Sequence, residues 1–162
     1  MNFFDLITNF IFSFVATVGF SIFFNAPKKS LIPCGLIGGI GWSTYIVLSN
    51  LTKVPLFSMV IASAVISLSS EILARKLKYP AISFIIPGIL PLVPGIGLYN
   101  TMYSLVQKDY VAAVATGTDT LLKSGGIAIG ILIITSLTKT YYILLAKIKI
   151  RKYKQNMNTD KI

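Results

Sequence analysis

Apolar residues fill five long stretches of the chain, and charged residues gather in the short segments between them. Each stretch has about twenty residues or slightly more, the length that an α-helix needs to cross the hydrocarbon core of a bilayer. The stretches cover residues 4–24, 31–51, 54–73, 79–99 and 121–145. The pattern predicts an all-α, polytopic membrane bundle of about five transmembrane helices.

The fourth stretch differs from the others because proline and glycine interrupt it. It holds four prolines and three glycines, among them Pro87, Gly88, Pro91, Pro94 and Gly95. Proline removes a backbone donor and clashes with the preceding turn, so one unbroken helix is excluded here. A broken helix is tolerated at membrane depth only where protein covers it or where it lines a polar cavity. Since transporters hold their solutes at such breaks, these five residues are candidates for a solute site or pathway.

Composition and charge support the membrane interpretation. Of the 162 residues, 54% are hydrophobic and only 12% are charged, against about 25% charged residues in a typical soluble domain. A net charge of +10 would indicate nucleic acid binding in a soluble protein. Here the basic residues lie between apolar stretches, where they orient a chain in the bilayer. We therefore expect a lipid environment and no nucleic acid partner.

The distribution of lysine and arginine predicts the orientation. With five crossings, twelve of the fifteen basic residues fall on one side of the membrane, which is then the cytoplasmic side. If residues 31–51 do not cross, the best split is ten to five, so whether this stretch spans fully stays open. The prediction is a multi-pass protein of the cell inner (cytoplasmic) membrane, with its N-terminus outside and its C-terminus in the cytoplasm.

Two segments outside the stretches complete the predicted organisation. Residues 100–120 form the one sizeable outer loop, with a short amphipathic helix at the interface. Residues 1–146 form the transmembrane bundle, and residues 147–162 form a basic cytoplasmic tail that lies on the anionic inner leaflet.

Glycines spaced four residues apart predict where helices pack closely. Gly35 and Gly39 form one such pair, and Gly126 and Gly130 form another. Small residues at this spacing let two membrane helices approach backbone to backbone. Such a surface serves plain packing, or it is a smooth face along which a helix slides during transport.

Three polar side chains stand out among the apolar stretches. Asn25 ends the first stretch, where it is a helix stop or an amide that contacts a carboxylated solute. Asp119 precedes the last stretch, where it caps a helix or forms a proton or cation site that couples transport. Glu71 lies one helical turn before Arg75, a spacing that predicts a local ion pair.

Enzymatic chemistry lacks its usual groups in this sequence. There is no histidine and only one cysteine, Cys34, so the common general base and a thiolate metal site are both missing. No serine–histidine–aspartate set and no phosphate loop of the G-x-x-x-x-G-K type occur. We expect no catalytic residues, no metal and no cofactor.

Two segments resemble the threonine/serine exporter-type family. Residues 18–42, VGFSIFFNAPKKSLIPCGLIGGIGW, resemble the "G-F-x-x-x-F-N-x-P" start of its small-subunit half. Residues 70–102, SEILARKLKYPAISFIIPGILPLVPGIGLYNTM, resemble its "P-x-x-P-G" core followed by a tyrosine and a methionine. The resemblance covers roughly residues 15 to 145.

The resemblance implies a function that composition cannot give. In this family two membrane halves come from one long chain or from two genes, and a chain like this one resembles the small subunit. It implies a secondary exporter of threonine and serine, or of a dicarboxylate such as succinate, that works with a larger membrane subunit. The alternatives are a scaffold that does not transport and a channel-like pore. The resemblance leaves the stoichiometry open, a higher oligomer included.

Overall fold

The computed structural model describes the backbone of residues 3–159 and the side chains of residues 4–145, 147 and 148. Over residues 3–159 the structure consists of helices, turns and short connections, with no strand. The helices are α1 (Phe3–Phe23), α2 (Leu31–Thr52), α3 (Pro55–Leu77), α4 (Ile82–Ile89), α5 (Gly95–Val106) and α6 (Tyr110–Thr159), with 3₁₀ turns η1 (Lys28–Ser30) and η2 (Leu90–Leu92). The predicted all-α fold is confirmed.

Four segments are long and apolar enough to cross a membrane, and a fifth is broken. The four are α1, η1 with α2, α3, and the Tyr110–Leu145 part of α6. The broken one joins Ile82–Leu92 to Gly95–Val106 at an angle of 59°. The prediction of about five spans, one of them interrupted by proline and glycine, agrees with this architecture.

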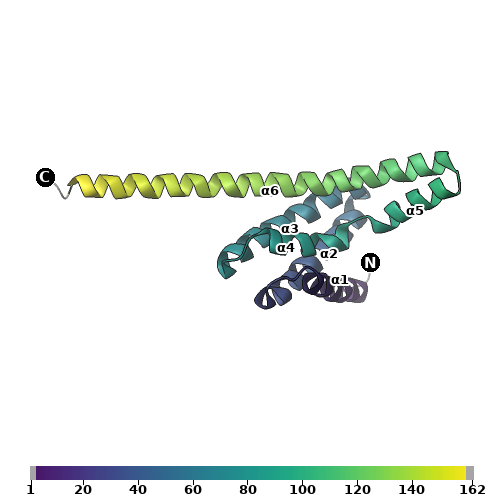
Figure 1. Cartoon of the computed structure of the whole chain (residues 1–162), viewed down its shortest axis with the longest axis horizontal. Coiled ribbons are helices and arrows are strands. Elements are labelled where there is room, and N and C mark those ends of the chain that lie inside the picture. The colour runs from purple at the N-terminus through teal and green to yellow at the C-terminus, as the bar shows by residue number, and fades with distance from the viewer. Residues whose placement is uncertain (1–2, 160–162) are drawn as a thin grey trace.

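The helices α1 to α4 form a compact group, and α6 runs along one side of it and continues beyond it (Figure 1). At the other end, α5 and the start of α6 form an antiparallel hairpin that projects from the group (Figure 1). Contacts pair Leu56 with Gly126, and Arg75 with Tyr142, so α3 and α6 run parallel. The intervening chain, α4 and α5, therefore returns to the side of the bundle where α3 begins.

The predicted outer loop at residues 100–120 is wrong. The helix α5 extends to Val106 and α6 begins at Tyr110, so the last membrane helix starts well before residue 121. Lys108, at φ 60°, adopts the left-handed conformation that ends α5. The Asp109 carboxylate then accepts a hydrogen bond of 3.0 Å from the Ala112 N–H and caps α6. The apolar residues of this segment belong to two antiparallel helices rather than to one interfacial helix.

Left-handed residues also end three other helices. Asn25, Lys53 and Lys78 have φ values of 52°, 54° and 58°. After Asn25, the Ala26 N–H donates to the Ser21 carbonyl over 2.9 Å, a bond typical of a helix end that turns through the left-handed region. Three of the four ends therefore present a lysine at a turn between apolar helices, where an ammonium can reach the headgroups.

Close packing at glycines holds the bundle together. A Cβ atom at Gly35 would lie 2.7 Å from Val18 Cγ2, and one at Gly39 would lie 2.7 Å from the Phe10 ring, so both face α1. A Cβ atom at Gly126 would lie 2.9 Å from Leu56 Cδ1 on α3. Gly130 abuts the Ser63 side chain and the α3 backbone. Gly35 and Gly39 thus leave room for side chains of α1, whereas Gly126 and Gly130 lie close to the backbone of α3.

The core beneath these contacts is small and apolar. Its buried side chains come from α2, α3, α4, α6 and η2 and include Cys34, Ile37, Ile66, Phe84, Leu92 and Ile127.

The helix α6 continues to Thr159, so the part of the predicted cytoplasmic tail up to that residue is helical. Residues 160–162 lie outside the described part of the chain, and the tail's position on the inner leaflet stays a prediction.

Candidate functional site

The break in the fourth span is built from a 3₁₀ turn and a γ-turn. After η2, the Val93 N–H donates to the Leu90 carbonyl over 3.2 Å. The Gly95 N–H then donates to the Val93 carbonyl over 2.7 Å, across Pro94 at φ −75° and ψ 64°. These dihedral angles are those of an inverse γ-turn. The turn redirects the chain, and α5 begins directly after it.

A cavity of about 600 Å³ adjoins this turn, and we call it the break cavity. Its volume lies in the range of small-molecule sites, roughly 300–1,000 Å³. Residues of α2, α3, η2, α5 and α6 surround it, namely Trp42, Tyr45, Met59, Pro91, Leu92, Val93, Pro94, Gly95, Ile96, Gly97, Asn100, Thr116, Asp119, Thr120 and Lys123. The first N–H groups of a helix have no partner within that helix, and the first turn of α5 lines this cavity.

The structure brings four of the predicted site residues together at the break cavity. Pro91, Pro94 and Gly95 come from the broken span, and Asp119 comes from α6. Asp119 is more than twenty residues from the other three in the sequence, and the α5–α6 hairpin brings it beside them. Each of the four residues was predicted from its own sequence context, and their shared cavity was not predicted.

The other three predicted site residues lie elsewhere. Asn25 is exposed at the end of α1 and shares a separate pocket of about 180 Å³ with Pro87. Gly88 is buried, and a Cβ atom there would lie 3.0 Å from Ile37 Cγ2 and 3.2 Å from Ile66 Cγ2. The left-handed conformation of Asn25 matches the helix-stop interpretation of this residue.

Asp119 pairs with Lys123 one turn further along α6. Lys123 Nζ lies 2.6 Å from Asp119 Oδ2, and both residues line the break cavity. The Asp119 side chain is 61% exposed and the Lys123 side chain 27%. The interpretation of Asp119 as a helix cap is wrong, because α6 begins at Tyr110 and Asp109 caps it.

Sequence reasoning used Lys123 only for topology and so missed it as a site residue. A carboxylate and an ammonium at i and i+4 inside an apolar segment are a recognisable signal for such a pair. Once α6 is continued back to Tyr110, both charges fall within the candidate span Tyr110–Leu145.

Aromatic and hydroxyl side chains of the cavity were also missed. The rings of Trp42 and Tyr45 lie with centroids 5.4 Å apart. On the hairpin, the Thr101 hydroxyl donates to the Gly97 carbonyl over 2.8 Å and to the Thr116 hydroxyl over 3.3 Å. Residues 116–120, TGTDT, hold the signal, since threonines at i and i+4 lie on one face of a helix.

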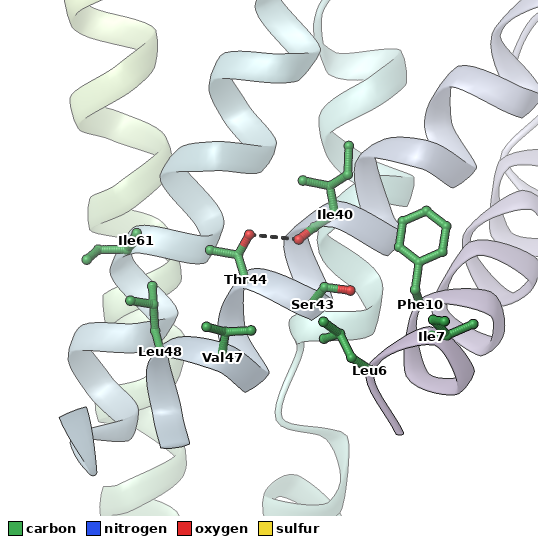
Figure 2. Close-up of a pocket in the computed structure, with 9 residues that line it drawn as sticks. All are labelled: Leu6, Ile7, Phe10, Ile40, Ser43, Thr44, Val47, Leu48 and Ile61. Atoms are coloured by element: carbon green, nitrogen blue, oxygen red, sulfur yellow. Dashed lines mark hydrogen bonds between the residues drawn. The ribbon is translucent and has the colours of Figure 1, made fainter. Parts of the chain in front are cut away.

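A groove of about 670 Å³ on α1, α2 and α3 offers a different chemistry (Figure 2). Apart from Ser43 and Thr44, its lining is apolar, and the Thr44 hydroxyl already donates to the Ile40 carbonyl over 2.8 Å (Figure 2). Ser43 Oγ is buried without a hydrogen-bond partner. With no charged group to match an ammonium or a carboxylate, this groove suits an acyl chain better than a polar solute.

Charged clusters give no metal site, since residues 3–159 contain no group of three or more His, Cys, Asp or Glu side chains suited to a metal ion. The charged groups that line the break cavity are the Asp119 carboxylate and the Lys123 ammonium.

Comparisons with known proteins place this geometry in context. A family model described as "Threonine/Serine exporter, ThrE" matches residues 9–137. A relative from Haemophilus influenzae (strain ATCC 51907 / DSM 11121 / KW20 / Rd), named "Uncharacterized protein", is 31% identical over 103 residues. The match covers 63% of this chain and 34% of that relative, so this chain accounts for about a third of the relative's length. No solved structure matches the chain.

Proposed function

The chain belongs to the threonine/serine exporter family, and from this premise we propose that it is the small membrane subunit of a secondary exporter of small amino acids. Membership in this family and the apolar helices make it a membrane transport protein. The observation that carries the finer proposal is the break cavity, where a broken span faces a carboxylate and an ammonium. Breaks of this kind serve transporters as solute sites near the middle of the membrane.

The charges at the cavity favour a zwitterion. The Lys123 ammonium and the first N–H groups of α5 can receive a carboxylate, and the Asp119 carboxylate can receive an ammonium. The ion pair between them, 2.6 Å long, would open as the solute takes both places. A dicarboxylate such as succinate would bring two negative charges toward one cation and one carboxylate. We therefore place threonine or serine ahead of a dicarboxylate.

The broken span contributes the backbone groups of the site. Pro91, Pro94 and Gly95 form the turn that exposes the start of α5. Pro87 and Gly88 support the preceding helix from within the bundle. Asn25 lies in its own pocket with Pro87, so we assign its amide to the end of the pathway rather than to the break cavity.

Asp119 is our candidate for the coupling group. A carboxylate in a membrane span is costly unless it is paired or hydrated, and such groups commonly relay protons. Protonation of Asp119 would remove its hold on Lys123 and on a solute ammonium. Export would in this way be tied to the proton gradient.

The exposure of Asp119 supports a partner subunit. Asp119 falls within the candidate span Tyr110–Leu145. A carboxylate that is 61% exposed within a span needs protein or water around it rather than lipid. A second, larger membrane subunit that faces the break cavity would supply this cover. In the Haemophilus influenzae relative the matched region is 34% of the chain, so further sequence adjoins it there.

The arrangement of turns favours an orientation with the N-terminus outside. Lys28, Lys29 and Lys78 lie in turns at one end of the spans, and Lys53 and Lys108 lie in turns at the other. The end with more basic residues is the cytoplasmic one by the positive-inside rule. The helical continuation of α6 beyond residue 146 then extends into the cytoplasm.

Export from proteoliposomes tests this proposal. We would reconstitute the chain with the larger subunit, and each protein alone, and follow labelled threonine and labelled succinate under a proton gradient. We expect threonine to move only with the pair, and Pro91→Ala with Pro94→Ala to abolish the movement. A pair that moves neither solute would contradict the exporter proposal, and full export by the larger subunit alone would reduce this chain to a scaffold. Solute flux that neither saturates nor depends on the proton gradient would indicate a channel.

A further inference from the structure

A second, more open hollow on α1 adjoins the break cavity, and its α1 residues Phe12 and Ala16 are exposed. It has a volume of about 290 Å³ and is lined by Asn9, Phe12, Ser13, Ala16, Trp42 and Pro91. We call it the α1 cavity. Trp42 and Pro91 line both cavities, so the indole and the pyrrolidine ring form the partition between them.

The positions of the two rings that form the partition bear on alternating access. Trp42 is near the middle of α2 (Leu31–Thr52), and Pro91 lies within η2, just before the γ-turn of the break. Alternating access requires two compartments on either side of a blocked point near the middle of the membrane. The two cavities and the two rings between them have this arrangement.

A single hydrogen bond fixes the indole in its position. Trp42 Nε1 donates to Asn9 Oδ1 over 3.3 Å, and on its other side the ring lies 5.4 Å from the Tyr45 ring, centroid to centroid. The Asn9 side-chain amide also donates to the Asp5 carbonyl over 2.8 Å, which orients its oxygen. The indole is only partly buried, and rotation away from Asn9 would cost one polar contact and some ring packing.

The α1 cavity also offers polar groups that an acyl chain would not use. Asn9 and Ser13 lie one turn apart on α1, and the Ser13 hydroxyl donates to the Gly38 carbonyl over 3.0 Å. An amide and a hydroxyl can solvate a small zwitterion in transit, although the cavity holds no charge to retain it. This chemistry suits a weak exit or entry compartment rather than a tight binding site.

We propose that the α1 cavity is a second compartment of the solute pathway and that Trp42 is the gate between it and the break cavity. This inference rests on the proposed transport function, because it assigns the passage used by the same small zwitterion. A solute leaves the break cavity when the Trp42–Asn9 hydrogen bond opens and the indole swings aside. The bond closes again behind it.

Cysteine labelling tests whether the α1 cavity holds water, independently of any solute. In a Cys34→Ala background, Ala16→Cys places a thiol in the α1 cavity, and Val15→Cys places one on a neighbouring exposed face of α1. With the subunit pair in proteoliposomes, we expect a polar methanethiosulfonate to modify Ala16→Cys and to leave Val15→Cys unmodified. Equal reaction of both, or reaction of neither, would overturn the second compartment.

Leakage tests the gate. We expect Trp42→Ala to let labelled threonine run down its own gradient without a proton gradient, about tenfold faster than the parent pair. Asn9→Leu should leak in the same direction but less, while Thr8→Val, which loses only a bond to its own helix, should stay tight. If the Trp42→Ala and Asn9→Leu variants assemble correctly with the larger subunit and their vesicles do not leak threonine, the proposed gate is overturned.

The two failures remain distinguishable. If the parent pair moves no threonine, the proposed function fails, and the labelling of Ala16→Cys still decides the second compartment. In that case the gate is judged by whether Asn9→Leu accelerates this labelling, and unchanged labelling would overturn it. If the parent pair transports threonine and neither variant leaks, only the gate fails.

Discussion

Two ion pairs with the same spacing differ in how far their carboxylates are exposed, while both cations are partly covered, Arg75 at 37% and Lys123 at 27% exposure. Glu71 and Arg75 lie at the end of α3, where Arg75 Nη2 is 2.8 Å from Glu71 Oε2 and its guanidinium carbon is 3.4 Å from the centre of the Tyr142 ring. The Glu71 side chain is only 10% exposed. The Asp119 side chain, in the pair on α6, is 61% exposed and borders the break cavity.

The comparison shows that the burial of a carboxylate decides whether it stabilises helix packing or is open to a solute. The predicted Glu71–Arg75 ion pair is confirmed, and its groups use their interactions on each other and on Tyr142, so it stabilises the crossing of α3 and α6. Because the Glu71 carboxylate is buried, loss of its cationic partner would leave a buried charge alone, which is costly. The Asp119–Lys123 pair is open enough for a solute to enter, and a pair that exposed adds little stability.

The largest effect is expected from neutralising the open pair. Asp119→Asn removes the charge that would receive an ammonium or a proton but keeps the shape of the side chain. We expect export of labelled threonine by the reconstituted pair to fall about 100-fold, equivalent to roughly 2.7 kcal/mol. The amount of assembled protein should not change. Glu71→Gln serves as the matched control, and an equal loss of export per assembled molecule in both variants would erase the distinction.

The free energy of unfolding tests the same comparison between the two ion pairs. Glu71→Leu removes the buried carboxylate and leaves the Arg75 guanidinium, whose side chain is 37% exposed, with the Tyr142 ring alone. We expect the free energy of unfolding to fall by about 2 kcal/mol, as for the loss of a hydrogen bond to a charged group, whereas Asp119→Leu should change it by less than about 1 kcal/mol. Denaturant titration of the protein in mixed micelles measures both. A larger loss for Asp119→Leu than for Glu71→Leu would reverse the assignment of roles.

A smaller effect on the free energy of unfolding is expected from removing the ring contact between Arg75 and Tyr142. Tyr142→Leu keeps the apolar bulk on α6 but removes the ring that lies against Arg75. We expect a loss of about 1 kcal/mol, typical of a cation–π contact, by the same titration. Tyr141→Leu, at the next position, tests the specificity of the loss and should have a smaller effect. Transport per assembled molecule should be normal in both variants.

The sequence predicted the architecture because hydrophobic length and proline content act locally. Each apolar stretch had to be helical in lipid, and Pro91 and Pro94 had to interrupt the fourth one. The start of α6 could not be placed in this way. Its first turns carry polar residues such as Thr116 and Asp119, and these are tolerated because they face α5 and the break cavity.

The site was only partly predictable for a related reason. Proline and glycine report on their own backbone, so the break was visible, but a cavity is made by side chains that are distant in sequence. Trp42 and Lys123 become site residues only because the α5–α6 hairpin brings α6 to the broken span and α2 lies behind it. Asn25 illustrates the converse, since a polar residue at a span end was explained by its backbone conformation alone.

Because α6 is one unbroken helix, a tilt of the helix would move its two ends by different distances. One helix of 50 residues carries Lys123 near one end and reaches Thr159 at the other (Figure 1), and its tightest contact with α3 is at Gly130. If Gly130 is the fulcrum, a tilt of roughly 10° displaces Lys123 by about 2 Å and the far tip by about 8 Å, at a rise of about 1.5 Å per residue. A small rearrangement around a bound solute would thus be magnified about fourfold at the distal end of the rod.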